Sequence, residues 1–328
     1  MMRTRVFVGA LLALTRVVAA QQPDTSFRHA NASPAFATGT GPVVCVDESH
    51  ANLHTVAGTY APFAKLVRDD GYRVQSLAER WSRSALRACS VLVIANAVAA
   101  ANTRDRSLPH PPALDKPELD TLVAWIADGG SLLLIADHTP FAGAMADLGL
   151  ILGVEMLDAF AAPGDSGGII AVFGVPMVSD SAWRQYAADR NVTYRPVAGA
   201  IANPGTLGSH AILRGRNESE RVRWVTTFTG HAFHPSTRVQ PLLIFGPRAV
   251  AGIDRPDAAT FPVGGWLQGG AVEFGVGRAV VLGEATTCTA QVGGPRRVRT
   301  GMNVPEARDN AQFCLNVVHW LTSVLEGR

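Results

Sequence analysis

The stretch between residues 115 and 152 constrains the fold more than any other part of the sequence. An amphipathic helix, ended by two glycines, leads into Leu132–Ala136, which is apolar at every position. A strand is apolar on both sides only when both faces of its sheet are covered. The apolar runs 43–46 and 90–95, separated by helical segments, repeat this arrangement. Residues 42–155 therefore predict an α/β fold with a parallel sheet flanked by helices on both faces.

The remaining sequence completes a single domain over residues 42–328. Residues 156–220 carry many Gly, Pro and Ala in short segments, which predicts an irregular insertion. Strand-like runs follow, and Gly275-Val276-Gly277 is a link tight enough for a β-hairpin near the C-terminal end. An amphipathic helix over 310–325 closes the domain. Residues 21–41 are small and polar, and we expect them to form a flexible leader ahead of the domain.

The first twenty residues predict export. Arg3 and Arg5 precede an apolar stretch, and Val18-Ala19-Ala20 places small residues just before Gln21. This is the layout of a cleaved secretory signal peptide, with an uncleaved anchor as the alternative. The apolar stretch is shorter than the ~20 residues that span a bilayer, so no stable membrane span is expected after cleavage. The sequence therefore predicts a periplasmic or extracellular protein.

The charge balance argues against one class of partner. The whole chain has 29 Lys and Arg against 27 Asp and Glu. The signal segment holds three of the arginines and no acid, so the chain without it is slightly acidic. No basic run with interleaved aromatics occurs elsewhere, which disfavours nucleic-acid binding. Only Lys65 and Lys116 are lysines, and this preference for arginine indicates a GC-rich bacterial source.

The cysteines are Cys45, Cys89, Cys288 and Cys314. No CxxC spacing occurs, so a zinc knuckle is excluded. An oxidising compartment would permit disulfides, but Cys45 lies inside a strand and Cys314 on the apolar face of the last helix. We therefore expect most of the cysteines to be buried free thiols that pack as small apolar groups. A Cys45–Cys89 disulfide is the alternative, because both residues lie in or beside strands that could be neighbours.

Polar side chains follow the apolar strands at one edge of the predicted sheet. Ligands of open parallel sheets bind beyond the carboxyl ends of the strands. The residues that follow each strand are therefore the candidate site. In chain order they are Asp47, Glu48, His50, Asn52, Asn96, Asp137, His138 and Glu284.

Each of these residues also has a purely structural interpretation. Asp47 could cap the turn that follows it, and His50 with Asn52 could form a hydrogen-bonded loop pair. Asp137 could cap the next helix, and Glu284 could bridge to a nearby arginine. Capping alone does not require acids and histidines to gather at one end of a sheet, so we favour a functional site.

Two kinds of chemistry fit this set. His50, Asp137, His138 and Glu284 could bind a divalent metal such as zinc or manganese, although neither HExxH nor HxH spacing is present. Without a metal, a histidine beside an orienting carboxylate could act as an acid–base pair on a polar ligand. His231, after another strand, could face the same crevice or belong to a structural turn.

Five segments carry a resemblance to a known family: GPVVCVDESHANLHT, GGSLLLIADHTPFAGA, VTTFTGHAF, GRAVVLGEATTCTAQ and GMNVPEARDNAQFCLNVVHWL. They resemble uncharacterised bacterial exported proteins with a class I glutamine-amidotransferase-like, flavodoxin-like domain, over about residues 42–325. More distantly, the fold is similar to trehalose-utilisation proteins and the trimerisation domain of some β-galactosidases. The resemblance implies a central parallel sheet with flanking helices. True amidotransferases carry Cys at an elbow where this chain has Ala136-Asp137-His138-Thr139, so glutaminase activity is not expected.

The sequence therefore predicts a hydrolase that acts on a polar small molecule or carbohydrate. Its catalytic residues would be Asp137, His138, His50 and Glu284. A non-catalytic module that binds a ligand or partner with the same residues is the main alternative, and a structural domain of the cell envelope is a third. The residues expected to assist in binding are Asp47, Asn52, Asn96, His231 and Asn303.

Overall fold

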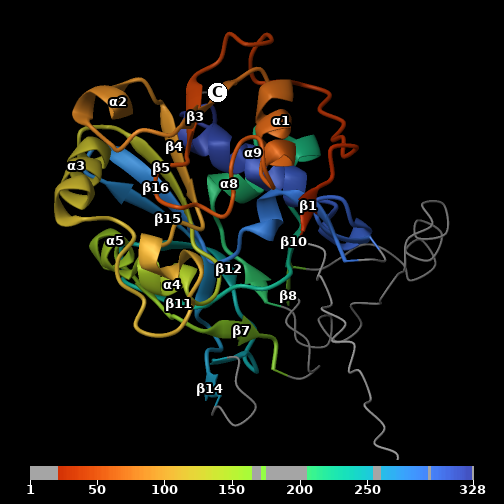
Figure 1. Cartoon of the computed structure of the whole chain (residues 1–328). Coiled ribbons are helices and arrows are strands. Elements are labelled where there is room, and N and C mark those ends of the chain that lie inside the picture. The colour runs from red at the N-terminus through yellow and green to blue at the C-terminus, as the bar shows by residue number, and fades with distance from the viewer. Residues whose placement is uncertain (1–20, 165–170, 175–204, 254–259, 295–296, 327–328) are drawn as a thin grey trace, which may run out of the picture.

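The central sheet contains the apolar strands predicted from the sequence. The computed structural model describes residues 21–164, 171–174, 205–253, 260–294 and 297–326 (Figure 1). Five neighbouring strands run parallel in the order β3-β2-β4-β5-β16. Their bounds in that order are Arg73–Leu77, Val43–Asp47, Val91–Ala95, Ser131–Ile135 and Gly277–Leu282.

Antiparallel strands extend the sheet beyond β16. β15 pairs with β16 and is followed outward by β11 and β6, while β12 pairs with both β15 and β9. The sheet is therefore mixed, with all its parallel strands on one side. The antiparallel strands are Leu267–Phe274 (β15), Phe233–Pro235 (β11), Val154–Met156 (β6), Gln240–Ile244 (β12) and Thr206–Leu207 (β9).

Helices cover both faces of the parallel strands, as predicted. Along β5, Leu133 and Ile135 belong to one apolar core and Leu132 and Leu134 to the other. Successive side chains of a strand point to opposite faces, so a fully apolar strand supplies both cores. The first core is covered by α1 (Ala61–Asp69), α8 (Ala211–Arg214) and α9 (Asn310–Leu321), and the second by α2 (Arg83–Arg87), α3 (Lys116–Ala127), α4 (Phe141–Ala144) and α5 (Ala146–Leu152) (Figure 1).

Smaller elements complete the described part of the chain. One three-stranded sheet joins β1, β17 and β18, another joins β14, β13 and β7, and β8 pairs with β10. These strands are Gln22–Pro23 (β1), Phe160–Ala162 (β7), Ala171–Gly174 (β8), Trp224–Thr227 (β10), Val250–Gly252 (β13), Phe261–Pro262 (β14), Ala290–Gly293 (β17) and Val298–Gly301 (β18). Short 3-10 turns span Ala100–Thr103 (η1), Glu218–Glu220 (η2), Thr286–Cys288 (η3) and Pro305–Ala307 (η4).

Two predicted segments fall wholly or partly outside the described residues. The signal peptide over residues 1–20 is one, and much of the irregular insertion over 156–220 is the other. The described parts of the insertion are short strands, turns and the one-turn helix α8. Within the ranges given above, no helix is long and apolar enough to cross a bilayer.

The leader over residues 21–41 is packed against the domain, which corrects the prediction of a flexible segment. Its strand β1 pairs antiparallel with β17. Further along, the buried Asp70 carboxylate accepts hydrogen bonds from the Asn31 amide at 2.6 Å and the Ala35 N–H at 2.9 Å. The other oxygen of Asp70 lies 2.6 Å from Nε2 of His319 in α9. The leader is therefore held by specific polar contacts, which its polar composition does not reveal.

All four cysteines form disulfides. Cys45 of β2 bonds to Cys89, just after α2, and Cys288 of η3 bonds to Cys314 of α9. The prediction of buried free thiols is therefore wrong, and the alternative Cys45–Cys89 pair is correct. The second pair depends on how α9 packs over the turn after β16, and no sequence pattern fixes that contact.

We expect the Cys288–Cys314 disulfide to contribute substantially to stability. It closes a loop with a sequence separation of 26, and loops of this size give roughly 3 kcal/mol in the chain-entropy treatment. A Cys288→Ala/Cys314→Ala variant should lose about that much free energy of unfolding in urea titrations. A thiol reagent added to denatured, unreduced wild type should detect no free thiol, and a reading of four thiols would contradict the pairing.

Candidate functional site

The parallel strands place four polar residues at one edge of the sheet. Asp47 ends β2, Asn96 follows β4, Asp137 follows β5 and Glu284 follows β16. All four are buried, with at most 6% of each residue exposed. Their hydrogen bonds nevertheless divide them into two clusters.

The Asp47 cluster consists of Asp47, Ser49, His50, Asn52 and Trp81. The Asp47 carboxylate accepts hydrogen bonds from the Ser49 hydroxyl at 2.7 Å, the Asn52 amide at 2.9 Å and the Trp81 indole at 3.2 Å. Nδ1 of His50 lies 3.0 Å from the same carboxylate. The donors engage both oxygens of a fully buried acid. Asp47 therefore shapes this loop, in agreement with its structural interpretation.

His50 is held between two carboxylates. Its Nε2 lies 3.3 Å from Oε1 of Glu118. Arg80 donates one hydrogen bond to each oxygen of the Glu118 carboxylate. Burial opposes protonation of the ring, but the hydrogen bonds and charges of Asp47 and Glu118 outweigh it and raise the pKa of His50. Both ring nitrogens are engaged, so His50 presents neither of them to a substrate. The structure thus separates His50 from the other predicted catalytic residues.

Asp137 and His138 lie together in the second cluster. Oδ1 of Asp137 accepts hydrogen bonds from the N–H of His138 at 2.8 Å and the Thr229 hydroxyl at 2.9 Å. Nδ1 of His138 lies 2.7 Å from the carbonyl oxygen of Thr139. A carbonyl can only accept, so Nδ1 carries the proton and Nε2 of the neutral ring is an acceptor. Nε2 lies 4.0 Å from Oδ1 of Asp137, and the two side chains are 20% and 9% exposed.

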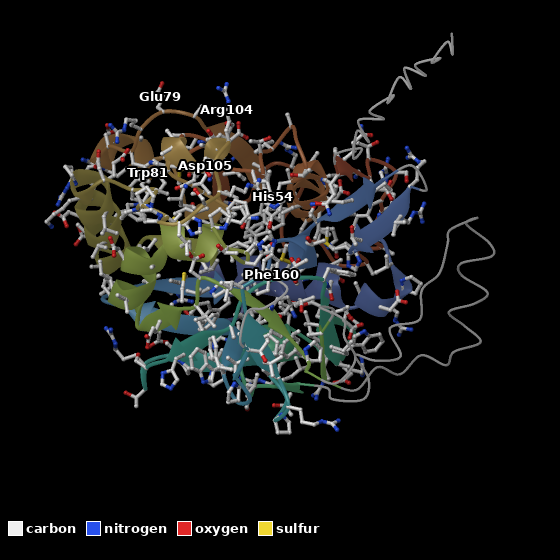
Figure 2. All side chains as sticks on the ribbon, turned by 60° about the horizontal axis from the view of Figure 1, so that its bottom comes forward. His54, Glu79, Trp81, Arg104, Asp105 and Phe160 are labelled. Carbon is white, nitrogen blue, oxygen red and sulfur yellow. A yellow bond between two sulfur atoms is a disulfide. The ribbon has the colours of Figure 1, made fainter. Side chains whose placement is uncertain are left out.

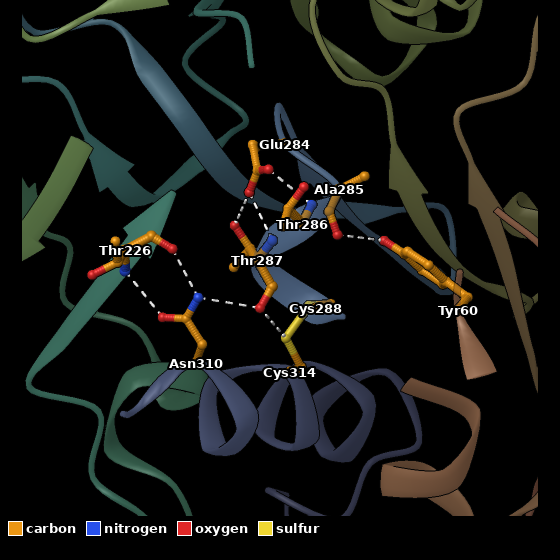
Figure 3. Close-up of a disulfide and its surroundings, with 9 residues drawn as sticks. All are labelled: Tyr60, Thr226, Glu284, Ala285, Thr286, Thr287, Cys288, Asn310 and Cys314. Carbon is orange, nitrogen blue, oxygen red and sulfur yellow. Dashed lines mark hydrogen bonds between the residues drawn. A yellow bond between two sulfur atoms is a disulfide. The ribbon is translucent and has the colours of Figure 1, made fainter. Parts of the chain in front are cut away.

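Glu284 is buried beside Asp137. Its Oε1 accepts from the N–H of Thr286 at 2.8 Å, and its Oε2 from the N–H of Thr287 at 2.7 Å and from the Thr287 hydroxyl (Figure 3). Burial, reinforced by the negative charge of Asp137, outweighs these donors and raises the pKa of Glu284 to about 8. Near neutral pH, Glu284 therefore keeps its proton. Glu284 is 1% exposed and does not face a substrate, so we assign it a positioning role.

Asn96 fixes the backbone of Asp137. Its φ of 55° lies in the left-handed region, which residues other than Gly seldom occupy. In this conformation Oδ1 of Asn96 accepts a hydrogen bond from the N–H of Asp137 at 2.9 Å. Its Nδ2 is buried and has no hydrogen-bond partner among the described residues. Asn96 therefore positions the acid and leaves one donor unused at this edge.

Two further residues of this edge were not predicted. Thr229 orients the Asp137 carboxylate through its hydroxyl. Tyr60 is fully buried, and its hydroxyl donates to the carbonyl oxygen of Ala285 at 2.9 Å (Figure 3). Thr229 was detectable in principle as a polar residue directly after a strand, like Asp137. Tyr60 was not, because an apolar aromatic residue just before α1 looks like an ordinary core residue.

Phe160 covers one face of the His138 ring. The two rings stack with 4.0 Å between centroids and an interplanar angle of 19°. Phe160 begins β7, and Figure 2 shows it near the centre of the molecule, away from the margin where Glu79 and Arg104 lie. This stacking restricts rotation of the imidazole and so helps to aim Nε2.

Two residues predicted to bind ligand have other surroundings. His231 is fully buried, neither of its ring nitrogens has a hydrogen-bond partner in the described part of the chain, and burial lowers its pKa to about 4. It is a neutral core histidine. Asn303 donates to Asp24 at 2.8 Å and to the carbonyl oxygen of Gln291 at 3.0 Å. Asn303 therefore joins the leader to the sheet of β17 and β18, which corrects its predicted place at the catalytic edge.

The four predicted metal ligands do not meet at one point. His50 contacts Asp47 and Glu118, whereas Asp137 and His138 belong to the second cluster. Across the described ranges, no group of three or more His, Cys, Asp or Glu side chains is placed to hold a metal ion. The predicted residues therefore form no common ligand set.

Comparison with solved structures shows the fold alone. The mmIFT52 N-terminal domain superposes with a TM-score of 0.50 and 13% identity, over 86% of this chain and 97% of that domain. A protein from Bacteroides uniformis described as ThuA-like has a TM-score of 0.44 and 11% identity, over 90% and 94% of the two chains. A cytoplasmic protein from Salmonella typhimurium has a TM-score of 0.44 and 12% identity, over 85% and 98%. Neither a protein-family model nor a curated protein matches the sequence.

We expect Asp47→Ala to act mainly on stability. The substitution leaves the His50 ring and the Trp81 indole without their buried acceptor, and breaking a buried pair in this way costs about 3–5 kcal/mol. Urea unfolding should show this loss. The control is Asp120→Ala, which removes an exposed pair with Lys116 and should cost less than about 1 kcal/mol. Equal stabilities for the two variants would refute the role given to Asp47.

We expect Glu284 to make the protein less stable as the pH rises. In the unfolded chain the Glu284 carboxyl group loses its proton near the ordinary pKa of 4.5, whereas in the folded chain it keeps the proton up to about pH 8. Between these values the folded state binds more protons, so the free energy of unfolding falls with pH, by at most about 1.4 kcal/mol per unit. Urea titrations at several pH values in this window should show that the free energy of unfolding of Glu284→Gln changes less with pH than that of the wild type. The exposed control Glu273→Gln should keep the wild-type slope.

Proposed function

We propose that this protein is a hydrolase acting on a polar small molecule or carbohydrate, with Asp137 and His138 as its catalytic residues. The observation that carries the proposal is a partly exposed histidine whose Nε2 is open, 4.0 Å from a carboxylate at the carboxyl end of a parallel strand. A buried acid of raised pKa lies beside them. Groups with perturbed protonation that gather in this way are typical of functional sites.

In the proposed reaction His138 is the general base. A water molecule that donates to Nε2 gives its proton to the ring while its oxygen bonds to the electrophilic carbon of the substrate. The Asp137 carboxylate stabilises the imidazolium that results. The ring then returns the proton to the leaving oxygen as the bond to that oxygen breaks. Neutral Glu284 does not compete for the imidazolium, so Asp137 alone supplies the stabilising charge.

The order of the parallel strands supports a finer description of the fold. Taken in chain order, β3-β2-β4-β5-β16 reads 2-1-3-4-5, which is the order of flavodoxin-like sheets. We propose that the domain is of this type, similar to class I glutamine amidotransferases. Such sheets bind ligands where the strand order reverses, here between β2 and β4, and Asn96 follows β4 at that point. Asp137 and His138 stand where an amidotransferase would have its Cys, so we expect no glutaminase activity.

We also propose that the protein works outside the cytosol. The layout of residues 1–20 supports export. Two disulfides within the folded domain are consistent with this, because disulfides persist in oxidising compartments and are rare in the cytosol.

The proposed function predicts turnover that depends on both residues. A panel of chromogenic glycosides and sugar esters should contain at least one substrate that the purified protein hydrolyses. His138→Gln and Asp137→Asn should each lower kcat on that substrate by about 10²–10⁴-fold, as expected for loss of acid–base catalysis. The control His234→Gln removes an exposed histidine of β11 and should leave kcat unchanged.

Three other results would change the proposed function. Unchanged turnover in both variants would overturn the catalytic assignment. Saturable binding of a panel compound without turnover would support the non-catalytic alternative. Activity that is lost on chelation and restored by zinc or manganese would point to a metal-dependent reaction instead of the one proposed.

A further inference from the structure

A cavity lies where the leader meets the start of α9. Its volume is about 580 Å³, which is within the range of small-molecule sites. The lining residues come from three parts of the chain: the leader between residues 24 and 30, the stretch between residues 299 and 305, and the start of α9 with Arg308 just before it and Ala311 in its first turn. Asn303, which the catalytic edge does not use, is among the lining residues.

Three arginines give this cavity an excess of positive charge. Arg28, Arg299 and Arg308 line it, and Asp24 is the one acid among the lining residues. Nη1 of Arg28 donates at 2.7 Å to two carbonyl oxygens of the leader, which holds the guanidinium in place. Arg308 lies over the Trp224 ring, with 5.6 Å from Cζ to its centroid. Neither Arg28 nor Arg308 forms an ion pair with any residue that the structure describes.

Asp24 is already engaged and balances only one of the three arginines. It accepts hydrogen bonds from Ser26 and, at 2.8 Å, from Asn303, and it lies 3.7 Å from Nε of Arg299. Burial opposes ionisation of Asp24, but these hydrogen bonds and the charge of Arg299 outweigh it and lower the pKa. Asp24 therefore stays charged and fixes the leader, while Arg28 and Arg308 have no acidic partner among the residues that the structure describes.

The N-terminus of α9 adds to the positive electrostatic potential in the cavity. No side chain caps the N-terminus of α9, a helix of 12 residues, and Ala311 of its first turn lines the cavity. A helix N-terminus carries about half a positive charge. Apolar side chains, among them Phe27 and Met302, form another part of the wall. The cavity therefore offers positive charge together with an apolar surface.

We propose that this cavity is a second binding site, which takes a small organic anion. Its carboxylate or phosphate group is held by Arg28 and Arg308, since guanidinium forks bind both groups through paired hydrogen bonds. Its apolar part lies against Phe27 and Met302. The leader supplies part of the site, so bound ligand also holds the leader to the domain. The site is separate from Asp137 and His138 and does not depend on the proposed hydrolase function.

Calorimetric titration of the purified protein with inorganic phosphate and with succinate tests the proposal, at an ionic strength kept constant with NaCl. We expect saturable binding of at least one probe, and the tighter one identifies the favoured anionic group. An Arg28→Gln/Arg308→Gln variant should bind about tenfold more weakly or worse, because charge-assisted hydrogen bonds are lost. The control is Arg83→Gln/Arg87→Gln, which removes two exposed arginines of α2 that line a different cavity.

A single Arg308→Lys variant guards against misfolding of the double variant. It keeps the charge but loses the planar fork, so we expect affinity between those of the wild type and the double variant. Thermal unfolding supplies an independent readout, because a ligand that binds only the folded state raises Tm in wild type. Absence of saturable binding of both probes to wild type, or equal losses in the test and control double variants, would overturn the site.

Discussion

The parallel register of β4, β5 and β16 is the constraint on which the candidate site depends. Ala95, Ile135 and Leu282 lie side by side in the ladder, so the chain leaves all three strands at one level. The next polar residues, Asn96, Asp137 and Glu284, are therefore delivered to one edge. Apolar burial on both faces holds this register, because slipping one strand by a residue would exchange the side chains that fill the two cores.

Buried carboxylates with several partners then fix the loops around the sheet. Asp47 gathers the loop after β2, and Glu284 holds the turn between β16 and β17. Asp70 ties both the leader and α9 to the end of α1. Each of these acids would be costly to bury alone, and each is surrounded by donors. Asp47, Asp70 and Glu284 are therefore structural residues, although from the sequence alone an acid is expected to be exposed or catalytic.

The sequence predicted the location of the candidate site better than its membership. Asp137 and His138 follow directly after a strand, so their placement required only the strand and its direction. His50 is different, because its second partner, Glu118, is 68 residues away and reaches it only once α3 is docked. Thr229 lies in the bend after β10 and Phe160 begins β7, and the pairing of these two strands has no local signature. The leader has the composition of a disordered segment, and its order comes from side chains elsewhere in the chain.

By itself the sequence determined the apolar strands, the helices on both faces and the edge at which polar residues gather. Hydrophobic periodicity is local, and the parallel direction follows from strands that alternate with helices. Only the tertiary structure decided which of those polar residues keep a side-chain atom that is free to contact a substrate. Both ring nitrogens of His50 lie against carboxylates, whereas Nε2 of His138 has no acid within hydrogen-bond distance in the described part of the chain. That difference is set by contacts between residues far apart in the sequence. Such contacts also determine the cysteine pairs, the docked leader and the arginine-lined cavity.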